Sequence, residues 1–332
     1  MRFEGSERKG AYLMGLTDLY RKGERILREK EYGWVLDAVE TGFILEHDRR
    51  ILDRYTFRPR YIGGVEPKTA CRVLGVELAT PVIMSAMTMP IPAITETGLM
   101  DVAEALKEAG SFMWTGTPTP KNLKELVASG VPIAANVKPF RDRDKMFRNL
   151  EDIQRAGVTW VGIETDAGQG TKIHDKQVAA DCAPLTLKEL QGIRQKVSCP
   201  LICKGVLSRQ DAEKCMAAGA DGMVVSNHGA HTLDYLPHPL QVMAEIVEAV
   251  AGQMVIIADG GFRRGSDVLK GLAFGASLVG LGRPILYSLA AEGRDGVREL
   301  MTEITAEMKR IMSLIGAEEP GRLVLDMLVE DP

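Results

Sequence analysis

The residues best suited to chemistry lie in a stretch of nine, Ser-Asn-His-Gly-Ala-His-Thr-Leu-Asp, at positions 226–234. This stretch follows the apolar run Gly222–Val225, so His228 is expected where a buried strand opens into a loop. A histidine in that position can take a proton from a bound substrate. Lys204 ends an earlier apolar run and Asp259 ends a later one. Three reactive side chains therefore follow three predicted strands.

Two glycine-rich turns follow the last two apolar runs and are suited to binding phosphate. The first reads Asp-Gly-Gly-Phe-Arg-Arg-Gly at 259–265, and the second reads Gly-Leu-Gly-Arg-Pro at 280–284. Glycines let backbone N–H groups approach a phosphate, and a helix N-terminus adds a favourable dipole. Arg263 or Arg283 can add a charge-assisted hydrogen bond. Tight turns that carry surface arginines are the alternative interpretation.

The elements that must position these residues alternate between short apolar runs and stretches with helical spacing, such as Gly98–Ala109 and Leu240–Val250. Parallel strands need such crossovers, and runs that are apolar throughout fit strands buried on both faces. Eight units in residues 76–316 predict an α/β fold, a (β/α)8 TIM barrel, with active-site residues at the strands' carboxyl ends. A doubly wound sheet is the alternative, but no Gly-x-Gly-x-x-Gly follows the first strand. The expected strands are Pro81–Ala86, Ser111–Thr115, Pro132–Asn136, Thr159–Glu164, Pro200–Lys204, Gly222–Ser226, Val255–Asp259 and Ser277–Leu281.

The segments on either side of the barrel are expected to belong to the same domain. Residues 1–75 are interpreted as an N-terminal helical cap, with helices over Leu16–Lys30 and Trp34–Leu52. Residues 317–332 form a charged C-terminal tail that we expect to be peripheral.

The composition excludes several classes of function. The net charge of −4 comes from 41 basic and 45 acidic residues without a basic block, so nucleic acid is not an expected partner. No apolar run approaches the roughly 20 residues needed to cross a bilayer, and no signal peptide is expected. The five cysteines are scattered and do not form a zinc motif, so we expect reduced thiols, a cytoplasmic protein and no metal.

Four motifs in order resemble the FMN-dependent 2-hydroxy-acid oxidases and dehydrogenases, the family of glycolate oxidase and L-lactate dehydrogenase. They are Lys-Gly-Val at 204–206, Ser-Asn-His-Gly at 226–229, Asp-Gly-Gly-x-Arg-Arg-Gly-x-Asp-Val at 259–268 and Gly-Arg-Pro at 282–284. The resemblance extends over residues 32–316. It implies an FMN cofactor in the barrel, a small-molecule substrate and a homo-oligomer, either a tetramer or an octamer.

The resemblance also implies which residues meet FMN. Its phosphate would be held by Gly260, Gly261, Gly282 and Arg283. Other positions that match flavin contacts in the family are Ser85, Ala86, Met87, Gly116 (or its neighbour Thr117), Asn136, Asp259 and Arg263.

Three residues match the family's reaction centre. Lys204 would lie against flavin N1 and the C2 carbonyl, where a cation stabilises the anionic reduced flavin. His228 matches the catalytic base, and Asp166 matches the carboxylate that orients it and favours the imidazolium. The alternatives are a solvated lysine at the end of a strand, a hydrogen-bonded core histidine, and an aspartate that caps the following loop.

The positions that would face the substrate depart from the family pattern. His231 replaces an arginine that grips the substrate carboxylate, and histidine lacks the guanidinium fork. Trp34 and Lys138 fall where tyrosines are expected; a core tryptophan and a solvated loop lysine are the alternatives. Lys138 could supply the missing positive charge. Glu164 replaces a small polar flavin contact, so an ion pair with Lys138 or Lys204 is expected.

The sequence thus predicts an FMN-dependent enzyme that oxidises the hydroxyl of a 2-hydroxy acid or a related substrate. Two alternatives stay open. One is non-redox flavin chemistry resembling type 2 isopentenyl-diphosphate isomerase, and the other is a flavin-binding protein with a degenerate substrate site.

Overall fold

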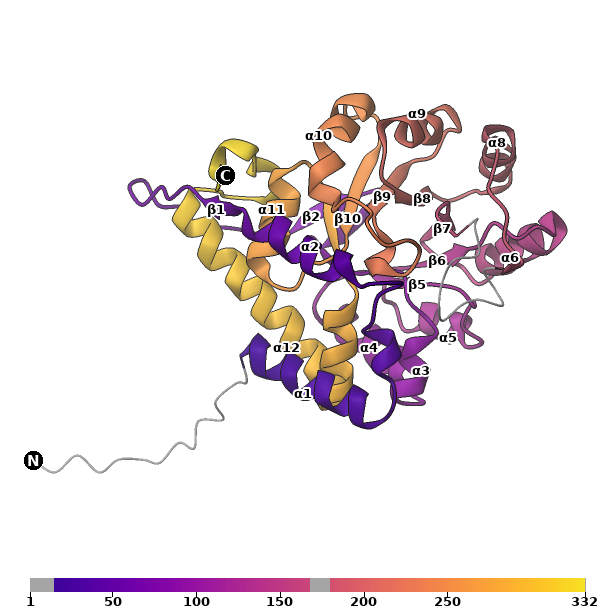
Figure 1. The fold of residues 1–332 in the computed structure, drawn as a ribbon, viewed down its shortest axis with the longest axis horizontal. Coiled ribbons are helices and arrows are strands. Elements are labelled where there is room, and N and C mark those ends of the chain that lie inside the picture. The colour runs from indigo at the N-terminus through magenta and orange to yellow at the C-terminus, as the bar shows by residue number, and fades with distance from the viewer. Residues whose placement is uncertain (1–14, 168–179, 332) are drawn as a thin grey trace, which may run out of the picture.

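Eight parallel strands form the centre of the computed structural model, which describes residues 15–167 and 180–331 (Figure 1). Each strand lies where an apolar run predicts it, because these side chains are buried on both faces of the sheet. The strands are β4 (Val82–Met84), β5 (Met113–Thr115), β6 (Ile133–Val137), β7 (Trp160–Glu164), β8 (Leu201–Val206), β9 (Gly222–Ser226), β10 (Val255–Asp259) and β11 (Leu278–Leu281).

The sheet closes into the predicted TIM barrel. Each strand from β5 to β10 pairs in parallel with the next, and β11 pairs with β4, with Met84 opposite Leu281. Between β4 and β5, the Met84 N–H donates to Phe112 O at 3.0 Å and the Met87 N–H donates to Trp114 O at 3.1 Å. A closed sheet brings the carboxyl ends of all its strands to one end of the barrel.

Helices surround the barrel and bury their apolar faces against it (Figure 1). The two helices predicted over Gly98–Ala109 and Leu240–Val250 are α4 (Gly98–Glu108) and α10 (Pro239–Val250). The segment α12 (Arg283–Ile315), which is kinked at Glu292 and Gly293, packs against α1 (Leu16–Glu29). The helices between and after the strands are α3 (Pro90–Ile94), α4 (Gly98–Glu108), α5 (Leu123–Ala128), α6 (Arg143–Arg155), α8 (Leu187–Lys196), α9 (Arg209–Ala217), α10 (Pro239–Val250), α11 (Gly265–Ala273) and α12 (Arg283–Ile315).

Aromatic side chains fill the amino-terminal half of the barrel. Phe112 stacks on Trp160 with ring centroids 4.0 Å apart, and Trp114 contacts both rings edge-on. The hairpin of β2 (Cys71–Val73) and β3 (Val76–Leu78) packs on this cluster just before β4. The barrel is therefore plugged at this end, which leaves the carboxyl ends of the strands as the end open to ligands.

The N-terminal segment forms α1 (Leu16–Glu29), as predicted, but the single helix expected over Trp34–Leu52 is wrong. The structure has a short 3-10 turn, η1 (Gly33–Val35), and then a separate helix, α2 (Phe43–Asp53). Asp234 causes the break, because its carboxylate accepts hydrogen bonds from the Thr41 N–H, the Thr41 hydroxyl and the Ile44 N–H. Gly42 has a φ of 73°, which a helix interior does not allow.

The C-terminal segment lies against the start of the chain. Strand β12 (Leu328–Glu330) pairs antiparallel with β1 (Tyr55–Phe57), and the 3-10 turns η3 (Pro320–Arg322) and η4 (Leu325–Met327) precede it. Leu323, Met327 and Leu328 are buried, so residues 317–331 add to the core rather than forming a loose tail. Within the described ranges, no helix has the length and apolarity needed to span a bilayer.

Candidate active site

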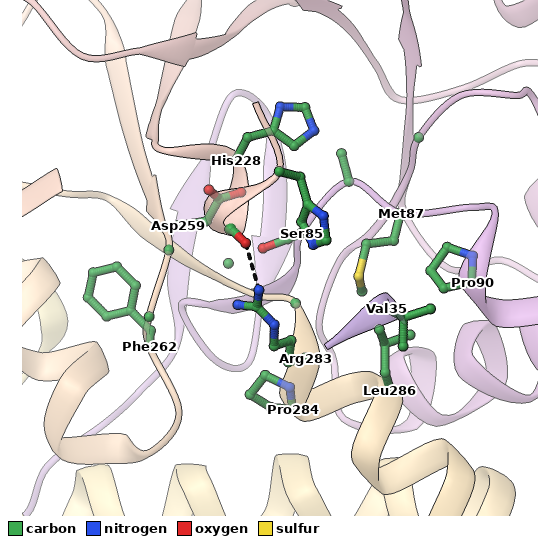
Figure 2. A pocket seen from close by; sticks show the side chains of 18 of the residues that line it. Val35, Ser85, Met87, Pro90, His228, Asp259, Phe262, Arg283, Pro284 and Leu286 are labelled. Atoms are coloured by element: carbon green, nitrogen blue, oxygen red, sulfur yellow. Dashed lines mark hydrogen bonds between the residues drawn. The ribbon is translucent and has the colours of Figure 1, made fainter. Parts of the chain in front are cut away.

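The carboxyl ends of the strands surround an open cavity of about 1180 Å³, counted to its mouth (Figure 2). The carboxyl end of the strands is where barrels of this kind bind their ligands. Three of the predicted site residues, Asn136, Lys138 and Asp166, lie outside its lining. The others line it: Trp34, Ser85, Ala86, Met87, Gly116, Glu164, Lys204, His228, His231, Asp259, Gly260, Gly261, Arg263, Gly282 and Arg283, together with Thr117.

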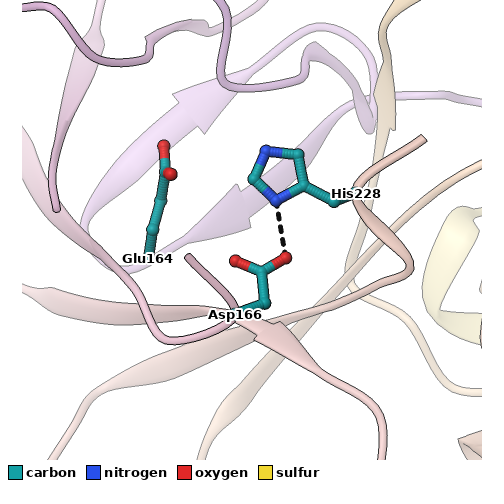
Figure 3. A group of neighbouring side chains, drawn as sticks. All are labelled: Glu164, Asp166 and His228. Atoms are coloured by element: carbon teal, nitrogen blue, oxygen red, sulfur yellow. Dashed lines mark hydrogen bonds and ion pairs between the residues drawn. The ribbon is translucent and has the colours of Figure 1, made fainter. Parts of the chain in front are cut away.

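His228 and Asp166 form a close pair at the ends of β9 and β7. His228 Nδ1 lies 2.6 Å from Asp166 Oδ2, and their side chains are only 9% and 14% exposed (Figure 3). Burial alone would raise the pKa of the Asp166 carboxyl, but the charges of His228 and Lys204 and the hydrogen bond from His228 hold that pKa below its usual value. The ionised Asp166 fixes the Nδ1 side of the ring and so orients the imidazole.

The loop that carries His228 is held by the two residues before it. The Ser226 hydroxyl accepts the His228 N–H at 3.0 Å, and the Asn227 side-chain oxygen accepts the Gly229 N–H at 3.2 Å. These contacts support a left-handed backbone, with φ of 57° at His228 and 59° at Gly229. His231 closes this turn and lines the cavity. The Ser-Asn pair thus positions the histidine.

Lys204 reaches the cavity from the end of β8 with 2% exposure. The ladder between β8 and β9 shifts register after Lys204, and Gly205 there has a φ of 96°. Asp166 packs into the space that Gly205 leaves, because a Cβ at 205 would lie 2.2 Å from Asp166 Cγ. The Lys-Gly step therefore places the lysine and the aspartate side by side. Gly205 is a site residue that sequence reasoning missed, although the Lys-Gly-Val motif contains it.

Glu164 lines the cavity and belongs to a buried network of polar side chains. Its Oε2 accepts from Lys138 Nζ at 2.9 Å, and its Oε1 accepts from Asn136 Nδ2 at 3.1 Å. The side chains of Lys138 and Glu164 are 0% and 2% exposed. Glu164 thus makes the expected ion pair, with Lys138 as the partner, whereas the alternative of a solvated Lys138 is wrong. Lys138 lies behind the cavity wall with its charge compensated by Glu164.

Glu164, Asp166 and His228 also bring possible metal-ligand atoms within 4.8 Å of one another (Figure 3). A cation there would compete with the hydrogen bond between Asp166 and His228 and with the ammonium group of Lys138. The cluster is therefore better suited to moving a proton than to holding a divalent ion.

The part of the cavity at the ends of β10 and β11 is suited to an anion. Gly260 and Gly261 have φ of 115° and 76°, a conformation that leaves their N–H groups open to an approaching ligand. Gly282 begins α12, whose N-terminus adds a positive dipole, and Arg263 and Arg283 line the same side. A phosphate therefore fits here, and Lys204, which also lines the cavity, can meet a second electron-rich group. This donor set fits FMN.

Arg283 is held in place by two backbone carbonyls. Its Nε donates to Leu36 O at 3.1 Å. Its Nη2 donates to Gly229 O at 2.7 Å, which is the dashed line in Figure 2. Burial lowers the pKa of the guanidinium, which nevertheless stays protonated. Arg283 thus connects the anion side of the cavity to the loop that carries His228.

Asp48 is a cavity residue that sequence reasoning missed. It lies on α2 with 2% exposure, beside Gly261, and its Oδ1 accepts from Asn227 Nδ2 at 2.8 Å. Burial raises the pKa of this carboxyl to about 7, although the hydrogen bond from Asn227 and the charges of Arg283 and Arg263 oppose that shift. No local pattern in the sequence places α2 against the barrel mouth.

Comparisons with known proteins agree with this site. A sequence model described as FMN-dependent dehydrogenase matches residues 24–181 and 168–330. The peroxisomal (S)-2-hydroxyacid oxidase GLO4 of Arabidopsis thaliana is 43% identical over 340 residues, covering 92% of this chain and 93% of that protein. The 4-hydroxymandelate oxidase of Amycolatopsis orientalis is 30% identical over 343 residues, covering 93% and 96%.

Solved structures give the same result for the fold. A mandelate oxidase determined with (S)-2-phenylpropionate superposes with a TM-score of 0.87 at 30% identity, covering 96% of this chain and 98% of that one. The barrel, the anion-binding turns and the family match therefore point to one conclusion. The chain belongs to the FMN-dependent dehydrogenase family and is an FMN-dependent oxidoreductase.

Proposed function

We propose that this enzyme oxidises the C2 hydroxyl of a 2-hydroxy acid, with His228 as the base. The observation that carries the proposal is the buried pair of His228 and Asp166, 2.6 Å apart, in the wall of a cavity built for FMN. The names of the relatives, which include a 2-hydroxyacid oxidase and an L-lactate oxidase, support this substrate class.

His228 Nε2 takes the hydroxyl proton as the alcohol becomes a carbonyl, and Asp166 stabilises the imidazolium that results. Bound FMN supplies the acceptor for two electrons and the remaining hydrogen. Lys204 places a cation next to the cofactor and favours its anionic reduced form. Gly260, Gly261, Gly282 and Arg283 would hold the phosphate of FMN.

The substrate side of the cavity is the least family-like part of the site. His231 and Trp34 both line it, and they offer an imidazole and an indole ring where an arginine and a tyrosine are expected. An imidazole binds a carboxylate strongly only when it is protonated, whereas a guanidinium always carries its charge. We therefore assign His231 to the substrate carboxylate and expect a weaker and more pH-dependent grip than arginine would give.

Anaerobic mixing of the FMN-loaded enzyme with a panel of 2-hydroxy acids tests the proposal. At least one member should bleach the flavin absorbance, and the H228A variant should keep its FMN while its reduction slows roughly 10²–10⁴-fold. His47, which pairs with Gln241 outside the cavity lining, provides the matched control, and H47A should react like the wild type. Bleaching by dithionite alone, or normal reduction of H228A, would reject the proposal. Isomerase activity without net flavin reduction would favour the non-redox alternative.

We further propose that the enzyme is a cytoplasmic homo-oligomer, a tetramer or an octamer. The five cysteines all carry free thiols, as a reducing compartment requires. Exposed apolar side chains at Tyr61, Ile62 and Leu314 offer surface for contacts between subunits. Light scattering after size-exclusion chromatography measures the assembly directly, and a monomer would reject it.

A further inference from the structure

A buried ion pair, formed by Glu164 and Lys138, is an unusual feature at the wall of a flavin cavity. Both side chains are almost fully buried, and each charge is costly there unless the other compensates it. A plain scaffold could use two apolar residues at these positions with little loss of stability. Glu164 lines the cavity, whereas Lys138 stands behind it. The pair thus presents a carboxylate to the cofactor and keeps its countercharge out of contact.

Asn136, the residue expected to meet the flavin, is engaged elsewhere. Its Oδ1 accepts from Trp114 Nε1 at 2.8 Å, and its Nδ2 donates to Glu164. The side chain fills the space above Gly162, where a Cβ would lie only 1.8 Å from Asn136 Oδ1. Asn136 therefore binds Glu164 without lining the cavity itself. Glu164 is the hydrogen-bond acceptor that this part of the wall presents to the cavity.

Glu164 and Lys204 are direct partners in the ladder between β7 and β8. The wall thus offers a carboxylate next to an ammonium group. The pyrimidine edge of a flavin has the matching order, with the acceptor C2 carbonyl followed by the donor N3–H. A cation on the carbonyl leaves the neighbouring N3–H to the carboxylate, which forms a charge-assisted hydrogen bond.

We propose that Glu164 accepts the flavin N3–H and that Lys138 limits the negative charge which this carboxylate imposes on the cofactor. The proposal rests on FMN binding, not on the identity of the substrate. Reduction of the flavin to its anionic form adds negative charge near Glu164, so the carboxylate opposes reduction and the buried ammonium of Lys138 favours it. The pair therefore sets the reduction potential.

Opposite shifts in reduction potential form the first test, with dithionite as the reductant so that no substrate is needed. E164Q keeps one acceptor oxygen but removes the negative charge, and it should raise the ratio of reduced to oxidised flavin at a fixed potential about tenfold, which is 29.6 mV for two electrons. K138M should lower that ratio. K138R keeps the charge and serves as the matched control, with a potential close to that of the wild type. An unchanged potential in E164Q would overturn the proposal.

A cofactor analogue forms the second test, and it does not depend on whether K138M folds. N3-methyl-FMN lacks the N–H donor, so the wild type should bind it roughly 10–100-fold more weakly than FMN. The double variant K138M/E164L replaces the ion pair by an apolar pair of similar volume, so it should fold and discriminate far less. Equal discrimination by the wild type and the double variant would overturn the proposal. Failure of every 2-hydroxy acid to reduce the enzyme would leave both results unaffected and would reject only the substrate assignment.

Discussion

Replacing Asp48 by asparagine should stabilise the protein more at pH 8.5 than at pH 5.5. Asp48 is buried beside Gly261, and burial raises the pKa of its carboxyl to about 7. A raised pKa means that the folded protein binds this proton more tightly than the unfolded chain does. The stability from Asp48 is therefore complete below the unfolded pKa and is lost as the pH rises through the folded value. Asparagine keeps the acceptor for Asn227 and does not titrate.

The size of the effect follows from the two pKa values, 3.8 and about 7. Each pKa unit corresponds to about 1.4 kcal/mol of free energy of unfolding. At pH 5.5 the wild type has already lost the part of this stability that corresponds to the range between the unfolded pKa and pH 5.5. The remainder, between pH 5.5 and the folded pKa, amounts to about 2 kcal/mol. D48N should therefore gain about 2 kcal/mol over the wild type between pH 5.5 and pH 8.5.

Urea unfolding at both pH values, with FMN in excess, measures this double difference. Asp53 on the same helix provides the control, because its hydrogen bond to Arg49 keeps the pKa of its carboxyl below the usual value. Asp53 is thus ionised at both pH values in both states, and D53N should show no change with pH. If the gain of D48N over the wild type is the same at both pH values, Asp48 is not the buried titrating group that the structure describes.

Three further substitutions have clear expected outcomes. D166N should keep FMN but lower kcat roughly 10²–10⁴-fold, because a neutral amide cannot stabilise the His228 imidazolium; an unchanged kcat would contradict the role of the pair. G162A should destabilise the protein by about 1–3 kcal/mol in thermal unfolding, since the new methyl group would overlap Asn136, and a neutral effect would contradict the packing described. R283K should weaken FMN binding roughly 10–100-fold by fluorescence titration, because lysine cannot replace a guanidinium held by two carbonyls; wild-type affinity would argue against a phosphate at this end.

The barrel could be predicted because its information is local. Runs such as Val255–Asp259 are apolar throughout and lie between helices, which only a parallel sheet covered on both faces accommodates. Once the barrel is assumed, Lys204, His228 and Asp259 must meet, since each lies at or near the carboxyl end of a strand. The roles of these residues in chemistry remain predictions.

What could not be predicted depends on contacts between distant segments. The break before α2 is made by Asp234, more than 180 residues away, and no local pattern reveals that partner. Asp48 reaches the cavity only because α2 lies over the barrel mouth. The sequence offered Lys138 and Lys204 equally as partners for Glu164, and the choice of Lys138 is decided by the packing behind the wall.

Barrel closure also has a consequence for how the chain is made in the cell. Met84 on the first barrel strand pairs with Leu281 on the last. This edge of β4 therefore stays unpaired until about 200 further residues have been synthesised. At about 5–20 residues per second, translation leaves it exposed for roughly 10–40 s. An apolar edge left open that long can pair with a neighbouring nascent chain. Added chaperones should therefore improve the yield of folded enzyme more than changes to its surface.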